Sequence, residues 1–318
     1  MEMVLMRLIE SHDLKVHFDS PAGLVKAVDG VNFHIDEGEK LVFIGETGSG
    51  KTVLGMTIMK LLPTNVFYSG QLMYKDKELI NATEKEMQEI RGKNIAIIMQ
   101  NPLSSLNPCL SIKEHLVQVI VKHEHLNKKE AQAEAERILI RTGIPENLLN
   151  YYTHQLSGGL RQRAMIALGI ACDSEILIAD EPTKGLDVTV QMQIVNLIKQ
   201  ITDETRKAML IITHDLGVAA ALGDRIAIMY CGRILEIGTV EEIFGSPEHP
   251  YTIGLINAHP SRGLHPIKGF GASLIDIPEG CVFSPRCQHA NELCKKAEPP
   301  DMVLSETHKV RCYYASSK

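Results

Sequence analysis

The chain has 318 residues, of which 44% are apolar, and a formal net charge of -6, so it can form one large domain or two smaller ones, and its acidic balance argues against a general nucleic-acid binder. No apolar run reaches the roughly 18 residues that a membrane span needs, and charged residues interrupt the apolar N-terminus, so we expect no signal peptide. The sequence therefore predicts a cytosolic chain, and its seven cysteines are not expected to form a disulfide framework in that reducing compartment.

Residues 39–44 predict a buried strand that runs into a glycine-rich turn, with a helix over residues 51–62. The turn reads GETGSGKT and fits the phosphate-loop pattern G-x-x-x-x-G-K-[ST]. Glycines let backbone N–H groups turn inward around phosphate oxygens, and the helix adds its positive N-terminal end. We expect Lys51 to reach the β- and γ-phosphates and Thr52 to bind Mg²⁺; an ordinary glycine turn is the alternative. The residues assigned to phosphate binding are Gly45, Gly48, Ser49, Gly50, Lys51 and Thr52.

Residues between about 103 and 172 are predicted to form a helical insertion. Within it, KKEAQAEAERILIRTG has apolar residues at helical spacing and stops at a glycine. The residues that carry this pattern are Ala131, Ala135, Ile138, Leu139 and Gly143.

Residues 175–180 predict a near-continuous apolar strand that ends in two acids. Asp180 is placed to hold Mg²⁺ or its water, and Glu181 could take a proton from an attacking water. Two acids can also simply end a strand at the surface, and it is the phosphate loop elsewhere in the chain that favours the nucleotide interpretation.

Further strands and helices alternate toward the C-terminus. A helix is predicted over residues 187–201, strands over 208–213 and 225–230, and a hairpin that leads into residues 234–238. This alternation indicates an α/β fold with a mainly parallel core. We expect this domain to occupy residues 1–245.

The stretch LSGGLRQR resembles the LSGGQ signature of the ATP-binding subunits of ABC transporters, with Leu160 in place of the glutamine. In that family, the signature serine and glycine N–H groups bind the γ-phosphate of ATP held by the opposite subunit. That role falls here to Ser157 and Gly159. Ser-Gly-Gly at a helix start is also an anion site on physical grounds.

The same resemblance assigns three further residues. Gln100 matches the Q-loop glutamine, which contacts Mg²⁺ and the attacking water, and His214 matches the switch histidine, which contacts the γ-phosphate. Phe18 matches the aromatic that stacks on adenine, although an isolated phenylalanine usually belongs to a core. The implied catalytic residues are Glu181, His214 and Gln100, and the implied Mg²⁺ ligands are Thr52, Gln100 and Asp180.

The resemblance covers nearly the whole chain and points to the oligopeptide/dipeptide branch through QNPLSSLNP, PEHPYT and the cysteine-containing tail. It implies a P-loop ABC ATPase domain with an antiparallel β subdomain and a helical insertion. Asp187 matches the D-loop aspartate, while Lys184 and Gly185 depart from the usual sequence of that loop.

The function implied is that of an ATPase that powers peptide import, with nickel or sugar import as alternatives. Its implied partners are a second, related ATP-binding subunit, two transmembrane permease subunits and an external substrate-binding protein, with no nucleic acid. Its implied location is the cytoplasmic face of the membrane. A soluble ABC ATPase that acts on DNA or ribosomes is the second hypothesis, and a metal-binding regulator that only binds nucleotide is the third.

Residues 246–318 predict a linker followed by a small cysteine-rich domain. Its cysteines follow the spacing C-x5-C-x6-C-x17-C, which is wider than the C-x2-4-C of common zinc sites. The spacing and the resemblance favour a [4Fe–4S] cluster; zinc and no metal remain alternatives. The proposed ligands are Cys281, Cys287, Cys294 and Cys312, whereas Cys109, Cys172 and Cys231 are predicted to be ordinary core residues.

Overall fold

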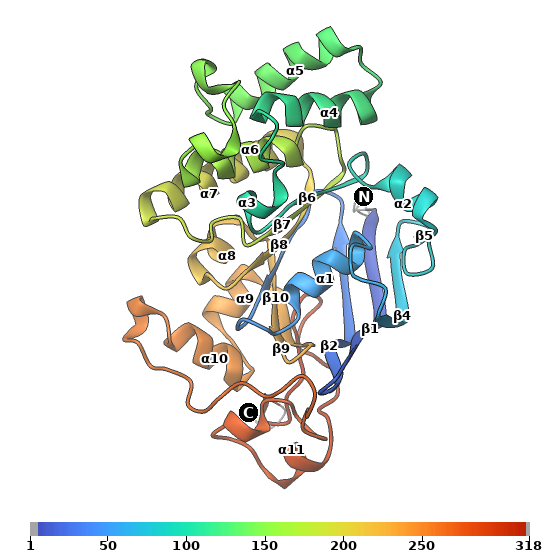
Figure 1. The fold of residues 1–318 in the computed structure, drawn as a ribbon. Coiled ribbons are helices and arrows are strands. Elements are labelled where there is room, and N and C mark those ends of the chain that lie inside the picture. The colour runs from blue at the N-terminus through green and yellow to red at the C-terminus, as the bar shows by residue number, and fades with distance from the viewer. Residues whose placement is uncertain (1–5, 316–318) are drawn as a thin grey trace, which may run out of the picture. The chain divides into compact units, whose positions relative to one another are not determined.

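The computed structural model describes residues 6–315, and the chain divides into two compact units. The first unit comprises Met1–Ala82 and Ile212–Lys318, and the second comprises Thr83–Ile211 (Figure 1). None of the helices in the part of the chain that is described combines the length and the hydrophobicity needed to cross a membrane.

An antiparallel sheet opens the first unit. Its strand order is β2 (Gly23–Asp36), β1 (Arg7–Ser20), β4 (Val66–Tyr74) and β5 (Lys77–Glu78). The pairing of β1 with β2 shifts register at several points, which is the mark of β-bulges and bends a long strand. This sheet is the antiparallel β subdomain that the family resemblance implies.

The first unit contains a second set of strands, which includes the strand just before the phosphate loop. β3 (Lys40–Ile44) pairs in parallel with β9 (Arg225–Tyr230), which pairs antiparallel with β10 (Arg233–Thr239). The predicted strands and hairpin are therefore confirmed. Two short strands from the tail, β12 (Lys309–Val310) and β11 (Met302–Val303), extend this sheet beyond β10.

The helices of the first unit are short. The helix after the phosphate loop was expected to reach residue 62 but ends at Ile58, because Lys60 adopts a left-handed φ of 48°. The helices are α1 (Lys51–Ile58), α8 (Leu216–Leu222), α9 (Val240–Gly245), α10 (Pro250–Asn257) and α11 (Glu292–Lys296), with single 3-10 turns at Pro260–Arg262 and Ser284–Arg286.

The second unit contains buried parallel strands. β6 (Ile95–Ile98) pairs in parallel with β7 (Ile176–Asp180), and β8 (Ala208–Thr213), in which the boundary between the units falls, lies beside β7. Every residue of β7 and β8 is buried, as expected of strands covered on both faces. The predicted helix after β7 is α7 (Val188–Thr205).

Helices dominate the rest of the second unit, where α4 (Ile112–Glu124), α5 (Lys128–Arg141) and α6 (Gly158–Gly169) lie close together (Figure 1). These three helices share one apolar core. The four apolar residues singled out in α5 are all buried there, and the helix stops before Gly143, whose φ is 80°. The helices are α2 (Glu84–Ile90), α3 (Pro102–Ser105), α4 (Ile112–Glu124), α5 (Lys128–Arg141) and α6 (Gly158–Gly169), with 3-10 turns at Glu146–Leu148 and Thr153–Gln155.

Residues 246–315, the C-terminal tail, group with the first unit, and β12 of the tail pairs with β10. The separate cysteine-rich domain and the expected domain boundary after residue 245 stay predictions. Cys172 and Cys231 are buried as predicted, but the prediction for Cys109 is wrong: it is exposed, in a turn where its N–H donates to Asn107 Oδ1.

Candidate nucleotide-binding site

The phosphate loop of the first unit needs its glycines for close approach. A Cβ on Gly45 would lie 2.0 Å from the carbonyl oxygen of Met229, and one on Gly50 would lie 2.0 Å from that of Ala27. Gly48 and Gly50 also adopt positive φ angles, 83° and 103°. The strand, turn and helix predicted for this motif are therefore present, and only glycine fits the turn without strain.

The side chain of Lys51 folds back and hydrogen-bonds to the phosphate loop. Its Nζ donates to the carbonyl oxygens of Gly45 (2.7 Å) and Glu46 (2.9 Å) and to Ser49 Oγ (3.2 Å). Thr52 begins α1 beside it with an exposed side chain. An ammonium and a hydroxyl at the N-terminus of a helix form an arrangement that can hold a phosphate and its Mg²⁺.

Two more predicted residues lie in the first unit. Phe18 is half-buried on β1, where it pairs with Val25 and Val66, so it is not a core side chain. His214 is exposed directly after β8, and the following residue, Asp215, caps α8. Neither position contradicts its assigned role, and both roles stay predictions.

The second unit places its polar residues at one edge of its parallel strands. β7 ends at Asp180, and Gln100 comes two positions after the end of β6, the strand that pairs in parallel with β7. The carboxyl ends of parallel strands are where α/β proteins bind ligands. Glu181 follows with a left-handed φ of 48° and is 8% exposed, a strained backbone of the kind that gathers at functional sites.

The signature residues of the second unit form the predicted helix start. Ser157 is the N-cap of α6, and its Oγ accepts the N–H of Leu160 at 3.4 Å. A Cβ on Gly159 would lie 2.7 Å from Val190 Cγ1 on α7, so that position needs glycine for packing. Asp187 caps α7. In the departing D-loop, Gly185 has a φ of 75°, which explains a glycine there.

One ion pair of the first unit was not anticipated. Arg286 Nη1 donates to both carboxylate oxygens of Glu46, at 3.0 and 2.9 Å. Glu46 is the second residue of the phosphate loop, and Arg286 lies in the tail. The only signal in the sequence was an arginine between two predicted metal ligands, Cys281 and Cys287.

The four tail cysteines lie on separate segments of the first unit. Cys281 and Cys287 flank the 3-10 turn Ser284–Arg286, Cys294 is in α11, and Cys312 follows β12. Burial raises the pKa of the Cys281 thiol to about 11, and the charges of the other three cysteines raise it too. Among residues 6–315, no three thiols have all their sulfur atoms within 4.8 Å of one another.

One other group of possible metal ligands is an ion-pair cluster. His34, Asp36 and Glu39 have ligand atoms within 4.8 Å of one another. Arg225 Nη1 donates to Glu39 at 2.7 Å and lies 3.1 Å from His34 Nε2. Burial, then the positive charges of Arg225 and Arg7, lower the pKa of His34 to about 4. The guanidinium thus engages two of the three groups that a cation would need.

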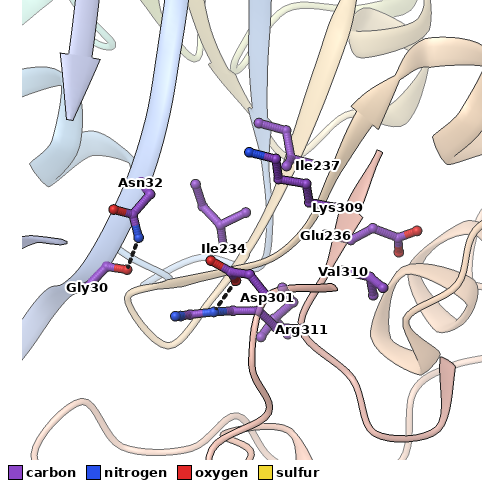
Figure 2. A pocket seen from close by; sticks show the side chains of 10 residues that line it. Gly30, Asn32, Ile234, Glu236, Ile237, Asp301, Lys309, Val310 and Arg311 are labelled. Carbon is purple, nitrogen blue, oxygen red and sulfur yellow. Dashed lines mark hydrogen bonds and ion pairs between the residues drawn. The ribbon is translucent and has the colours of Figure 1, made fainter. Parts of the chain in front are cut away.

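A small cavity marks where the tail lies against β10 (Figure 2). Its volume is about 50 Å³, well below the roughly 300 Å³ at which ligand pockets begin. Two pairs of its polar groups bond each other: Arg311 donates to Asp301, and the Asn32 amide donates to the Gly30 carbonyl. It is therefore a packing feature of the tail.

The chain is similar to known proteins over nearly its whole length. A family model described as ABC transporter matches residues 28–184, and one described as oligopeptide/dipeptide transporter, C-terminal region, matches residues 235–294. The oligopeptide transport ATP-binding protein OppD of Bacillus subtilis (strain 168) is 43% identical, covering 96% of this chain and 88% of that protein. The dipeptide transport ATP-binding protein DppD of the same organism is 40% identical, covering 96% and 94%.

Solved structures agree with these relatives. The ATP-binding cassette MJ0796, in a dimeric post-hydrolysis state bound to ADP and Pi, superposes with a TM-score of 0.67 at 27% identity, covering 73% of this chain and 99% of that one. The cbiO1 protein of Clostridium perfringens, part of the ABC transporter complex cbiONQ, gives a TM-score of 0.65 at 27% identity, covering 79% and 95%. The chain belongs to the ABC transporter family, among the ATP-binding proteins of the oligopeptide and dipeptide transporters.

Proposed function

We propose that the chain hydrolyses ATP to power the import of dipeptides or oligopeptides through a membrane transporter. The observation that supports this most directly is the phosphate loop, in which Lys51 and Thr52 open α1 beside a cradle that only glycine can form. The peptide substrate rests on the names of the relatives and on the transporter-type C-terminal region. Nickel or sugar import, and a soluble ABC ATPase, gain no support from them.

The chemistry follows from the donor types. MgATP would be bound by the phosphate loop, with Phe18 against adenine. Glu181 would accept a proton from the attacking water, and His214 would contact the γ-phosphate. The Mg²⁺ ligands would be Thr52, Gln100 and Asp180.

We also infer that a complete site needs two chains. Ser157 and Gly159 would bind the γ-phosphate held by a partner subunit, as the helix start they occupy favours anions. The partners proposed are a related ATP-binding subunit, two transmembrane permease subunits and an external substrate-binding protein. The chain would then sit at the cytoplasmic face of the membrane, bound through the permease subunits.

For the tail we propose a [4Fe–4S] cluster held by Cys281, Cys287, Cys294 and Cys312. The donor set fits, since four thiolates from separate segments are the usual ligands of such clusters. Three of the four side chains are buried, each 7% exposed. The charges of Cys312, Cys294 and Cys287 act on the pKa of the Cys281 thiol, as expected of four thiols that lie near one another. When bound, the cluster would cross-link a tail that has few large apolar residues.

Co-purification tests the transport proposal. The chain, expressed with its membrane partners and placed in vesicles, should hydrolyse ATP faster when the binding protein and a peptide are added. Peptide uptake should stop when ATP is withheld. Stimulation by nickel or an oligosaccharide, and none by peptide, would overturn the substrate assignment and leave the ATPase assignment in place.

A further inference from the structure

Arg286 is a buried cation of the tail that reaches the phosphate loop. Its side chain is 7% exposed, and its Nη1 donates to both oxygens of the Glu46 carboxylate. Its Nε donates to the carbonyl oxygen of Lys268 at 3.2 Å. Such a guanidinium is fixed in place, unlike an exposed arginine that exchanges partners with water.

Aromatic side chains also contact Arg286 and help to fix its position. Its guanidinium lies 5.7 Å from the ring centre of Tyr230 and 5.9 Å from that of Phe283, within cation–π range. The Tyr230 hydroxyl accepts from Arg286 Nη1 at 3.3 Å and from the N–H of Ala272 at 3.2 Å. The cation is therefore oriented by the core of the first unit as well as by the tail.

Glu46 connects Arg286 to the residues that would bind phosphate. Its N–H donates to the hydroxyl of Tyr251, a fully buried side chain. Its carbonyl oxygen accepts from the N–H of Ser49 at 3.1 Å and from Lys51 Nζ at 2.9 Å. A shift of Glu46 would therefore move the backbone and the ammonium that the phosphates require.

Glu46 also poses an electrostatic problem. A carboxylate in a loop built to bind a polyphosphate repels its ligand, since like charges at close range disfavour one another. A buried guanidinium bonded to both carboxylate oxygens cancels that charge.

We propose that Arg286 is a positioning residue of the nucleotide site, which neutralises Glu46 and fixes the start of the phosphate loop. The tail that carries the cysteines would thus contribute to nucleotide affinity without touching the nucleotide. The inference rests on the proposed function only in that a magnesium nucleotide is the ligand of the loop.

The test measures binding of MgADP to the full-length chain by calorimetry, which needs no permease, peptide or hydrolysis. Failure of the import function would therefore leave this test intact. Arg286→Gln should weaken MgADP binding about tenfold, because the Glu46 carboxylate, whose side chain is 34% exposed, loses its charged hydrogen-bond donor. Adding Glu46→Gln should recover part of the affinity, because it removes the uncompensated carboxylate. Arg286→Lys, which keeps the cation, should weaken binding less than Arg286→Gln.

Arg311→Gln is the matched control. Arg311 also precedes a cysteine and pairs with acids, Asp301 and Glu298, but neither acid is in the phosphate loop. It should change MgADP binding less than twofold. Equal losses in the two variants would show a general loosening of the tail and overturn the proposal.

Two further outcomes would contradict the positioning role of Arg286. Wild-type binding in a folded Arg286→Gln chain would also overturn the proposal, and so would a double variant that binds no better than Arg286→Gln. If Arg286→Gln does not fold, Tyr251→Phe, which removes the acceptor of the Glu46 N–H, should still weaken MgADP binding severalfold. Unchanged binding in that variant would count against the role of Glu46.

Discussion

Glu236 and His308 form a buried pair, with Glu236 Oε1 2.8 Å from His308 Nε2 and the two residues 1% and 5% exposed. The carboxylate of Glu236 also accepts the N–H groups of Glu248 and His249, just before α10. One carboxylate on β10 therefore joins the start of α10 and the segment that leads into β12. The tail depends on it because β12 itself pairs over only two residues.

This pair should make the stability of the tail depend on pH. The hydrogen bond to Glu236, and then the charges of Glu236, Glu242 and Glu248, raise the pKa of His308 against the effect of burial. Burial alone would raise the pKa of Glu236, but the hydrogen bonds it accepts, first from His308, lower it. The pair is therefore complete below the ordinary histidine pKa of about 6.5 and above the ordinary carboxyl range, and is lost as the pH rises through the raised pKa of His308.

His308→Gln should lower the free energy of unfolding by roughly 2 kcal/mol near pH 6 and by clearly less near pH 9. Urea unfolding at the two pH values measures the difference. His12→Gln is the control, since His12 is exposed beside Glu10 and should change little at either pH. An equal loss for His308→Gln at both values would contradict the ion pair.

The part of the site that could be predicted is the part whose residues are contiguous in the sequence. Strand β3, the glycine loop and α1 follow one another in the sequence, and local pattern was enough to find them. Strand β1 was not predicted, because its bulges break the alternation that reveals a half-buried strand. The contact between Glu46 and Arg286 joins residues 240 positions apart, and no local pattern encodes such a contact.

Cysteine burial shows the same limit. Cys172 and Cys231 are buried, but Cys109 is exposed in a turn beside Asn107 and Pro108. The surrounding turn formers outweigh the general preference of cysteine for the core. The tail cysteines could be grouped from spacing, yet their placement against the sheet of the first unit could not.

Glu181→Gln should leave MgATP binding in place and lower turnover by about a hundredfold or more, as loss of a general base does. It should also trap an ATP-bound dimer, because in the proposed shared site the unhydrolysed γ-phosphate would continue to bridge the two subunits. Turnover in the assembled transporter and gel filtration with ATP measure these effects. Glu204→Gln, at an exposed acid of α7, is the control, and wild-type turnover in Glu181→Gln would refute the role.

Ser157→Arg should abolish hydrolysis at the site whose phosphate loop belongs to the partner subunit. It should leave nucleotide binding to this chain's own loop unchanged, because Ser157 caps α6 rather than α1. Nucleotide binding to the isolated chain and ATP turnover in the complex separate the two effects. Thr205→Arg, at the exposed end of α7, should affect neither. Loss of binding in the isolated Ser157→Arg chain would show that the site is not shared.

Neighbouring glycines of the signature should respond differently to alanine. At Gly159 a Cβ would lie 2.7 Å from Val190 Cγ1, whereas at Gly158 its nearest neighbour is Leu186 at 3.6 Å. Gly159→Ala should therefore lower stability by about 1–3 kcal/mol through overpacking. Gly158→Ala should be neutral, or stabilising by up to about 1 kcal/mol, since alanine favours a helix. Thermal unfolding compares them, and equal effects would contradict the close packing of α6 on α7.

Anaerobically purified protein should be brown and contain about four irons per chain, as a [4Fe–4S] cluster requires. Cys→Ser at any one of Cys281, Cys287, Cys294 or Cys312 should lose iron and loosen the tail, because the cluster would supply stability that its small apolar core does not. Cys172→Ser, at a buried cysteine of the second unit, is the control and should keep its iron. Stoichiometric zinc without iron in the purified protein would contradict the cluster and indicate a structural zinc site. Four thiols that alkylate freely in metal-free protein would exclude both, and would leave the ion pairs of Glu236 and Arg286 to hold the tail.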